Sequence, residues 1–299
     1  MVTLIKSQGY GSGNKLQHNG IIEKLIMYCN LLISKLYYIL MYSSLQQREV
    51  FHLEFLRWFG LKADPKHYAL KGGVNMRLFF GSIRYSEDMD LDLSGIRIDI
   101  IQDIVLKILN TQNFVDNLRP YGIQRVSIPD MVKAKQTETT QRFKIHLATF
   151  AGEDLFARVK FSRRGMEDGT VVNAVPDSIL RTYKLIPIIV PHYDAMFATI
   201  QKITALASRP AVQARDIFDL YILSPKYLIS EISELRILKK DKLEKAYENL
   251  SSVTFEQFRD SVVLFLPPDE QAIYSSKLFW DEIKLKVANL LEGLMNKYG

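Results

Sequence analysis

The sequence has one cysteine, Cys29, among 299 residues, and this scarcity excludes an intramolecular disulfide. A chain without disulfides fits a reducing compartment, so we expect the protein to be cytoplasmic. Nothing around Cys29 suggests a nucleophile, and we expect it to be a buried packing residue. The chain also has no internal repeat and no low-complexity tract. Its apolar content of 47% and charged content of 24% are typical of an ordinary soluble globular protein.

No apolar run in the chain is both long and free of charge. Residues 21–45 come closest, but Glu23, Lys24 and Lys35 lie inside this segment, where a charge at bilayer depth costs several kcal/mol. No small-residue cleavage site follows a compact apolar core, which argues against a signal peptide. We therefore expect an amphipathic helix or helix pair packed on the rest of the protein, and no membrane partner.

The length predicts two domains behind an N-terminal helical extension. We place the extension at residues 1–50, a mixed domain of strands and helices at 51–192, and an all-helical domain at 193–299. Hydrophobic periodicity predicts three strands in the mixed domain, at residues 123–128, 142–149 and 155–161. It predicts helices at residues 46–59, 98–109, 193–207, 211–223, 239–250, 254–264 and 270–297.

Residues 86–93 are the most informative stretch, because Asp88, Asp90 and Asp92 alternate there with apolar residues. On a strand the three carboxylates would share one face. Ionised carboxylates this close repel each other and are rarely tolerated unless a cation lies among them. Mg²⁺ suits such a site, since it is held by one or two carboxylates plus substrate phosphates. The alternative from the pattern alone is a solvated strand face with chance acids.

A glycine pair, Gly72-Gly73, opens an apolar, helix-compatible stretch just upstream. Glycine lets the backbone approach a ligand closely, and free N–H groups at a helix start favour an anion. A glycine pair alone is usually only a turn. Before a short helix and alternating aspartates, it indicates phosphates cradled beside a metal, the arrangement of nucleotidyl transfer.

Two motifs follow one another in the chain. The first motif consists of Lys71, Gly72, Gly73, Gly81, Arg84, Ser86, Asp88 and Asp90. The second motif comprises residues 201–206 (QKITAL) and 214–220 (ARDIFDL). Together they resemble one known family, the AbiEii/AbiGii toxin group of type IV toxin–antitoxin systems within the polymerase-beta-like nucleotidyltransferases. The resemblance covers about residues 51–223 and implies an α+β fold, with a mixed central sheet in the catalytic domain and a helical C-terminal domain.

The resemblance implies transfer of a nucleotide from an NTP to an acceptor hydroxyl, dependent on Mg²⁺ or Mn²⁺. Asp88 and Asp90 would hold the metal, and Lys202 would neutralise the leaving pyrophosphate. Asp216 would orient Lys202 or help to activate the acceptor hydroxyl. The implied nucleotide contacts are Lys71, Gly72, Gly73, Arg84, Ser86 and Asp219.

Two positions depart from the family pattern. Val74 replaces the usual Thr or Ser, so a phosphate contact there must come from backbone amides or from Asn75. Lys160 stands where the family often has a third acid. Either two carboxylates suffice, or Asp92 or a downstream aspartate substitutes, or the activity is weakened.

An excess of basic residues in the middle of the chain suggests the class of acceptor. Between Arg119 and Met166 there are ten Lys/Arg and four Asp/Glu, a local balance of six positive within a chain of net charge +6. This suits a polyanion such as RNA, although a solvated basic surface is an equal alternative. The family includes toxins that act on the acceptor end of tRNA, and implies a cognate antitoxin. The predicted acceptor contacts are Arg158, Lys160, Arg163 and Arg164.

Two other functions remain open. The protein could be a weakened member that binds nucleotide or RNA without turnover. It could also be an antibiotic-type nucleotidyltransferase acting on a small hydroxylated acceptor, although a basic surface suits a cationic drug poorly.

Overall fold

The computed structural model describes residues 27–29, 42–128, 136–226 and 238–298. The helix predicted at residues 21–45 lies largely outside these ranges. Cys29 is exposed, as are its neighbours Met27 and Tyr28, so the prediction of a buried cysteine was wrong. None of the described helices is long and apolar enough to cross a membrane.

A mixed sheet forms the centre of the N-terminal half, with its strands in the order β3–β5–β6–β2–β1–β8–β7. The central pair β2–β6 is parallel, and β1 is antiparallel to β2. The short strand β4 pairs with β5 off this path. The strand bounds are β1 Tyr68–Lys71, β2 Asp88–Leu93, β3 Ile123–Ser127, β4 Gln136–Thr137, β5 Thr140–Thr149, β6 Asp154–Ser162, β7 Thr170–Ala174 and β8 Ile189–Tyr193.

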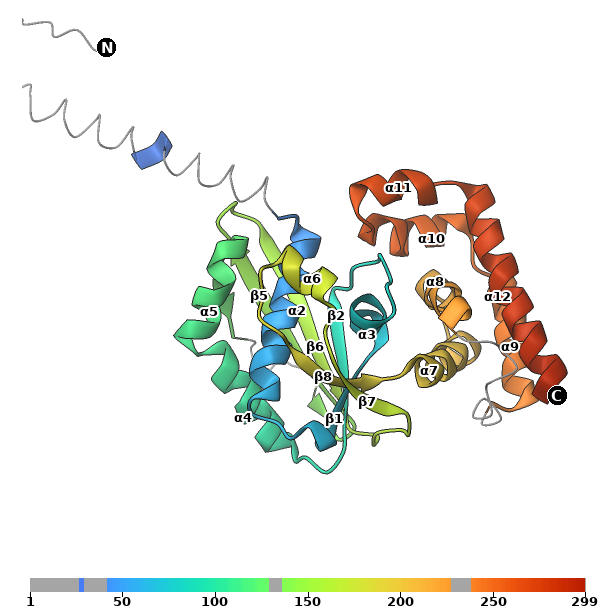
Figure 1. The fold of residues 1–299 in the computed structure, drawn as a ribbon, viewed down its shortest axis with the longest axis horizontal. Coiled ribbons are helices and arrows are strands. Elements are labelled where there is room, and N and C mark those ends of the chain that lie inside the picture. The colour runs from blue at the N-terminus through green and yellow to red at the C-terminus, as the bar shows by residue number, and fades with distance from the viewer. Residues whose placement is uncertain (1–26, 30–41, 129–135, 227–237, 299) are drawn as a thin grey trace, which may run out of the picture.

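Three helices cover one face of this sheet, as Figure 1 shows: α2 (Ser44–Gly60), α4 (Ile98–Leu109) and α5 (Gln112–Leu118). The alternating apolar residues of β2, β5 and β6 point into this layer and are almost fully buried, because side chains alternate along a strand. The predicted strands and the helices at residues 46–59 and 98–109 are confirmed to within a few residues.

Four strands were not predicted from the sequence, among them the two-residue β4. The four-residue β1 is too short to show an alternation, and β7 is an exposed edge strand without a buried side. The strand β8 contains Pro191, and proline is uncommon inside a strand. This strand pairs with β1 through one residue pair only, Leu70 with His192. Such limited pairing suits Pro191, because proline has no N–H to donate to a neighbouring strand.

The C-terminal half is helical, and from Tyr193 onward the described residues contain no further strand. The predicted helix at residues 270–297 is two helices, α11 and α12, separated at Ser275-Ser276. Trp280 is buried in the core of this half. The helices are α7 (Ala195–Ser208), α8 (Ala214–Leu223), α9 (Lys240–Ser251), α10 (Phe255–Ser261), α11 (Pro268–Tyr274) and α12 (Lys277–Tyr298).

Two large hydrophobic cores accompany the two halves. One joins the sheet to α2, α4 and α5, and the other joins α7 to α12. The proposed division between residues 192 and 193 stays a prediction; Tyr193, the last residue of β8, belongs to the second core. The helix α2 runs through residue 50, the proposed end of the N-terminal extension.

The helix α3 (Gly72–Phe79) is fixed to β8 by a buried polar contact around His192. The imidazole stacks on Phe79 with ring centroids 3.6 Å apart, and its Nδ1 lies 3.0 Å from Asn75 Oδ1. The Asn75 amide also donates to the carbonyl of Tyr193 at 2.9 Å. Burial lowers the pKa of His192 to about 4.

His192 should make the stability depend on pH. Because its pKa is lowered in the folded state, the unfolded chain takes up the proton first as the pH falls, so stability is lost between about pH 6.5 and pH 4. The loss from this residue should reach about 3 kcal/mol. We expect urea unfolding of wild type to lose more stability than that of His192→Gln across this range. Equal losses in both proteins would contradict the assignment.

Candidate active site

Two aspartates of β2 lie at the solvent-accessible end of the strand, each beside a basic residue of β6. Asp88 is in register with Arg158, whose Nε lies 2.5 Å from its carboxylate. Asp90 is in register with Lys160, and their charged atoms are 3.1 Å apart. The Asp88 and Asp90 side chains are 32% and 25% exposed, so both carboxylates are accessible to a ligand.

Asp92 points to the same face of β2 but lies under the helical half. Its residue is only 4% exposed, and its carboxylate contacts Lys71 Nζ at 2.5 Å. The Tyr193 hydroxyl donates to its other oxygen at 3.0 Å. Asp92 is therefore separated from the two accessible carboxylates, and the Lys71 ammonium is directed to Asp92 rather than to open solvent.

The glycine pair makes the closest approach of backbone to the acidic strand. Gly72 has a left-handed φ of +70°, and a Cβ built on it would lie 3.1 Å from Asp90 Oδ2. A Cβ on Gly73 would lie 2.7 Å from Ser86 Oγ and 3.1 Å from Arg84 Nη2. Only glycine fits these two positions without displacing its neighbours. Ser86 Oγ in turn donates to the carbonyl of Asp88 at 2.8 Å, which fixes the loop before β2.

The helix α3 begins at Gly72, so its first N–H groups start beside Asp90 and are available to an anion. Val74 and Asn75 are buried, and the Asn75 side chain is used by Tyr193 and His192. Of the two sources suggested for the missing hydroxyl contact, the backbone amides are therefore the accessible one.

A buried ionic cluster joins α7, α8 and the loop before β2. Lys202 Nζ on α7 lies 2.6 Å from Asp219 and 3.2 Å from Asp216, two carboxylates of α8 with no exposure. Arg84 Nη2 reaches Asp219 at 3.4 Å, and Arg209 Nε reaches Asp216 at 3.1 Å. The second sequence motif therefore converges on Arg84, which also lies against Gly73.

Lys202 and Asp219 both keep their charges in this cluster. Burial alone would lower the pKa of Lys202, but the two aspartates outweigh it and raise that pKa. Burial alone would raise the pKa of Asp219, but Lys202 and Arg84 outweigh it and lower that pKa. Both groups are therefore ionised around neutral pH, and Asp219 connects the lysine to Arg84, which lies against Gly73.

Two arginines of this region were missed as site residues. Arg215 of α8 lines a small hollow with Arg84, Ser86, Asp88 and Arg158. It belongs to the ARDIFDL segment, so the motif could have indicated it. Arg209 follows the end of α7, and no spacing in the sequence pairs it with Asp216.

The four predicted acceptor contacts are not brought together. Arg158 and Lys160 lie beside Asp88 and Asp90, but Arg163 and Arg164 follow the opposite end of β6. At about 3.3 Å per residue, Arg163 is about 16 Å along the strand from Arg158. Its guanidinium donates to the Glu138 carbonyl at 3.0 Å.

The donor set fits a magnesium ion whose other ligands come from the substrate. Within the described ranges no group of three or more Asp, Glu, His or Cys is placed to hold a metal. The candidate ligands are therefore the pair Asp88 and Asp90, and Mg²⁺ commonly takes two carboxylates together with phosphates. The helix start at Gly72, where those phosphates would be bound, borders Asp90.

Comparison with known proteins gives the family of the chain and neighbours of its fold. The family model described as "Nucleotidyl transferase AbiEii toxin, Type IV TA system" matches residues 55–282. MenT4, a nucleotidyltransferase toxin from Mycobacterium tuberculosis, has 12% sequence identity and a TM-score of 0.53, covering 85% of this chain and 93% of its own. JHP933 from Helicobacter pylori has 17% identity and a TM-score of 0.49, covering 86% of this chain and 94% of its own. No curated protein sequence matches the chain.

The fold and the family model define a nucleotidyltransferase, with a mixed sheet followed by a helical C-terminal region. The chain belongs to the AbiEii nucleotidyltransferase toxin family of type IV toxin–antitoxin systems. The resemblance and the α+β fold expected from the sequence are thereby confirmed.

Gly72→Ala should weaken nucleotide binding by at least about tenfold, because its Cβ would crowd Asp90 at the phosphate cradle. The matched control is Gly165→Ala, which also has a left-handed φ but has open space around its Cβ. Both variants should lose about 1–2 kcal/mol of stability from backbone strain. Calorimetric titration with a non-hydrolysable NTP analogue measures the difference. Equal affinities in the two variants would remove Gly72 from the site.

Lys202→Met should destabilise the protein by about 3–5 kcal/mol, because it leaves two buried carboxylates short of a counter-charge. Lys245→Met, which breaks an exposed ion pair with Glu248, should cost less than about 1 kcal/mol. Asp219 has a lowered pKa and contributes stability above about pH 4; Lys202 has a raised pKa and contributes below about pH 10.5. The loss, measured by urea unfolding, should therefore be constant from about pH 5 to pH 9. A loss no larger than that of the surface control would contradict the buried network.

Proposed function

We propose that this enzyme transfers a nucleotide from an NTP to a hydroxyl group of RNA, with the tRNA 3′ end as the acceptor site, and acts as a toxin by this reaction. The carrying observation is the convergence of the glycine turn, the two accessible carboxylates and the buried Lys202 cluster. Family membership implies an NTP substrate and a cognate antitoxin. We also propose a cytoplasmic location, which fits a chain with a single cysteine.

Asp88 and Asp90 would hold Mg²⁺ or Mn²⁺, which when bound offsets the negative charge of the reacting phosphates. The N–H groups at the start of α3 bind the phosphates, and Gly72 and Gly73 give the backbone room to approach them. Ser86 holds the loop that carries Asp88. These contacts position the nucleotide with its phosphates against the acidic strand.

Lys202 supplies a fixed positive charge for the leaving pyrophosphate. Its ammonium is buried among Asp216 and Asp219, which keep it protonated and oriented at neutral pH. Such preorganised charge stabilises negative charge that develops during transfer. Asp216 is fully buried and paired with Lys202 and Arg209, which favours its orienting role over activation of the acceptor.

Arg84 is better explained as a link than as a direct phosphate ligand. It is 4% exposed and pairs with Asp219, while its guanidinium lies against Gly73. Asp219 likewise acts through Arg84 and Lys202, because it has no exposed surface. Lys71 acts through Asp92 in the same way.

A second candidate is a weakened member of the family that binds nucleotide or RNA without turnover. It is favoured by Lys160, which pairs with Asp90 and stands where the family often has a third acid. An enzyme acting on a small cationic drug fits less well, because Arg158 and Lys160 flank the carboxylates with positive charge.

Asp90→Ala should abolish transfer of radiolabelled nucleotide to RNA in the presence of Mg²⁺, because half of the donor set is lost. Its stability should stay within about 1 kcal/mol of wild type, since the pair that it breaks is partly exposed. Metal-dependent binding of an NTP analogue should be lost together with transfer. Asp99→Ala, which removes an exposed aspartate paired with Arg97, is the control and should keep full activity.

Wild-type transfer rates in Asp90→Ala would contradict the assignment of this carboxylate. Metal-independent nucleotide binding that is equal in wild type and Asp90→Ala, without transfer by either, would favour the weakened enzyme.

A further inference from the structure

We propose that the exposed face of β5 and β6 is a binding platform for a single-stranded RNA end, which it leads to Asp88 and Asp90. This inference rests on the proposed function and extends it from two residues to a surface. Register places Lys144 of β5, Arg158 of β6 and Asp88 of β2 in one row across the sheet. The next row contains Arg142, Lys160 and Asp90.

Each of the two rows carries two cations and one carboxylate, so this face has a surplus of positive charge. Lys144 is directly opposite Arg158, and Arg142 is directly opposite Lys160, so two cross-strand pairs have like charge. Like charges in directly opposed positions destabilise a sheet. Packing does not require these residues, since the core side of both strands is formed by their alternate apolar residues. A polyanionic ligand would turn the repulsion into attraction.

An exposed aromatic ring lies within this basic surface. Phe156 follows the same face of β6, two residues before Arg158, and is 43% exposed. Lys144 Nζ lies 4.0 Å from its ring centroid, and the His146 ring lies 5.1 Å away. An aromatic face beside phosphate-binding cations is the combination that single-stranded nucleic acid uses, with a base stacked on the ring.

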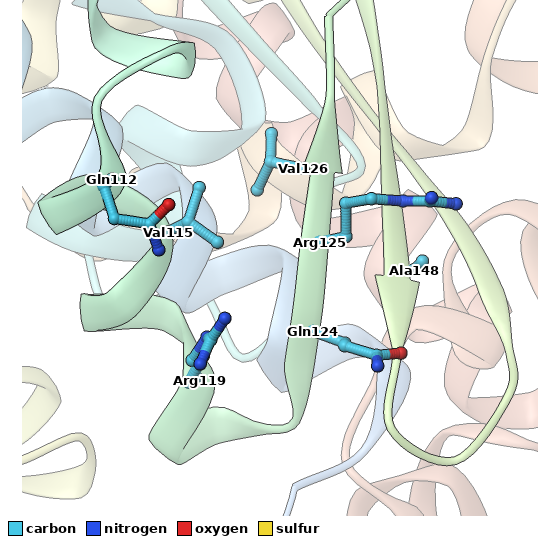
Figure 2. A pocket seen from close by; sticks show the side chains of 7 residues that line it. All are labelled: Gln112, Val115, Arg119, Gln124, Arg125, Val126 and Ala148. Atoms are coloured by element: carbon cyan, nitrogen blue, oxygen red, sulfur yellow. The ribbon is translucent and has the colours of Figure 1, made fainter.

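The platform continues to the edge of the sheet. Arg125 of β3 is in register with Ala148 of β5, and Figure 2 shows its side chain extended across β5, away from Gln112 of α5 and from Arg119, which follows α5. Arg125 is exposed and makes no ion pair with any residue of the described ranges. At about 4.8 Å between strands, it lies some 15 Å across the sheet from the acidic strand. That span suits an extended chain and exceeds the reach of a small acceptor.

Metal binding would strengthen the platform. Asp88 and Asp90 pair with Arg158 and Lys160, so the carboxylates neutralise the two cations nearest to the site. When the carboxylates bind a metal instead, both cations become available to phosphates of the acceptor. Acceptor binding and metal binding are therefore expected to assist each other.

The test measures equilibrium binding of a fluorescein-labelled single-stranded RNA to the full chain by anisotropy, without NTP. Lys144→Glu and Phe156→Ala should each weaken binding about tenfold, because they remove a phosphate contact and a stacking surface. Phe156→Tyr should retain wild-type affinity, since the ring is kept. The effect of Lys144→Glu should shrink at high salt.

Lys107→Glu is the matched control. It makes the same charge change at an exposed lysine of α4, on the helical layer that covers the other face of the sheet. It should change the affinity less than twofold. If Lys144→Glu and Phe156→Ala resemble this control, the platform is overturned. Equal binding of a blunt RNA duplex by wild type would also overturn it, because all bases except the terminal pairs are stacked within the duplex and cannot reach Phe156.

Asp88→Asn tests the link to the metal. Without divalent ions it should bind RNA about threefold more tightly than wild type, since Arg158 is released from its partner. Unchanged affinity would overturn this part of the inference.

The failure of the platform can be distinguished from failure of the proposed function. If wild type transfers nucleotide to RNA, and Lys144→Glu and Phe156→Ala transfer at the same rate at sub-saturating RNA, only the platform is wrong. If wild type transfers nothing to RNA, the proposed function is wrong, whatever the binding data show.

Discussion

Ion pairs between two fully buried carboxylates and three basic side chains connect the helical half to the loop before β2. Asp216 and Asp219 have no exposed surface, and an uncompensated buried charge is strongly destabilising. Lys202, Arg84 and Arg209 meet this requirement from three separate places in the chain. Because Arg84 also lies against Gly73, the same cluster sets the position of the glycine turn relative to the helical half. A stability requirement thereby fixes the position of a positive charge, that of Arg84, beside the glycine turn.

A second electrostatic feature follows from strand register. The parallel pairing of β2 with β6 sets Asp88 and Asp90 beside Arg158 and Lys160. Each carboxylate then has a counter-ion from the neighbouring strand, so two nearby acids are tolerated without a metal. In this chain, Lys160 is therefore the counter-ion of Asp90. Val74, the other departure from the family pattern, is buried in the core, and the amides at the start of α3 remain accessible.

Much of the fold could be predicted because the longer helices and strands have a regular alternation of apolar and polar residues in the sequence. The helix at residues 98–109 and the long strands β5 and β6 show a buried side and an exposed side throughout. The short or irregular strands did not show this. In β1 four residues cannot establish a period, β7 has no buried side, and β8 contains Pro191. Cys29 was expected to be buried because of its residue type, yet it lies in an exposed segment.

The sequence alone determined the family, the acidic strand and the glycine pair, because these depend on residue types at short spacings. A period of two places Asp88, Asp90 and Asp92 on one face wherever the strand lies. Only the tertiary structure decided that Asp92 is buried under Tyr193 while Asp88 and Asp90 stay accessible. It also brought Lys144 and Phe156 to the same face of the sheet as the acids and separated Arg163 and Arg164 from them. The reason is physical: which strands become neighbours, and in which register, depends on contacts between distant segments that no local pattern encodes.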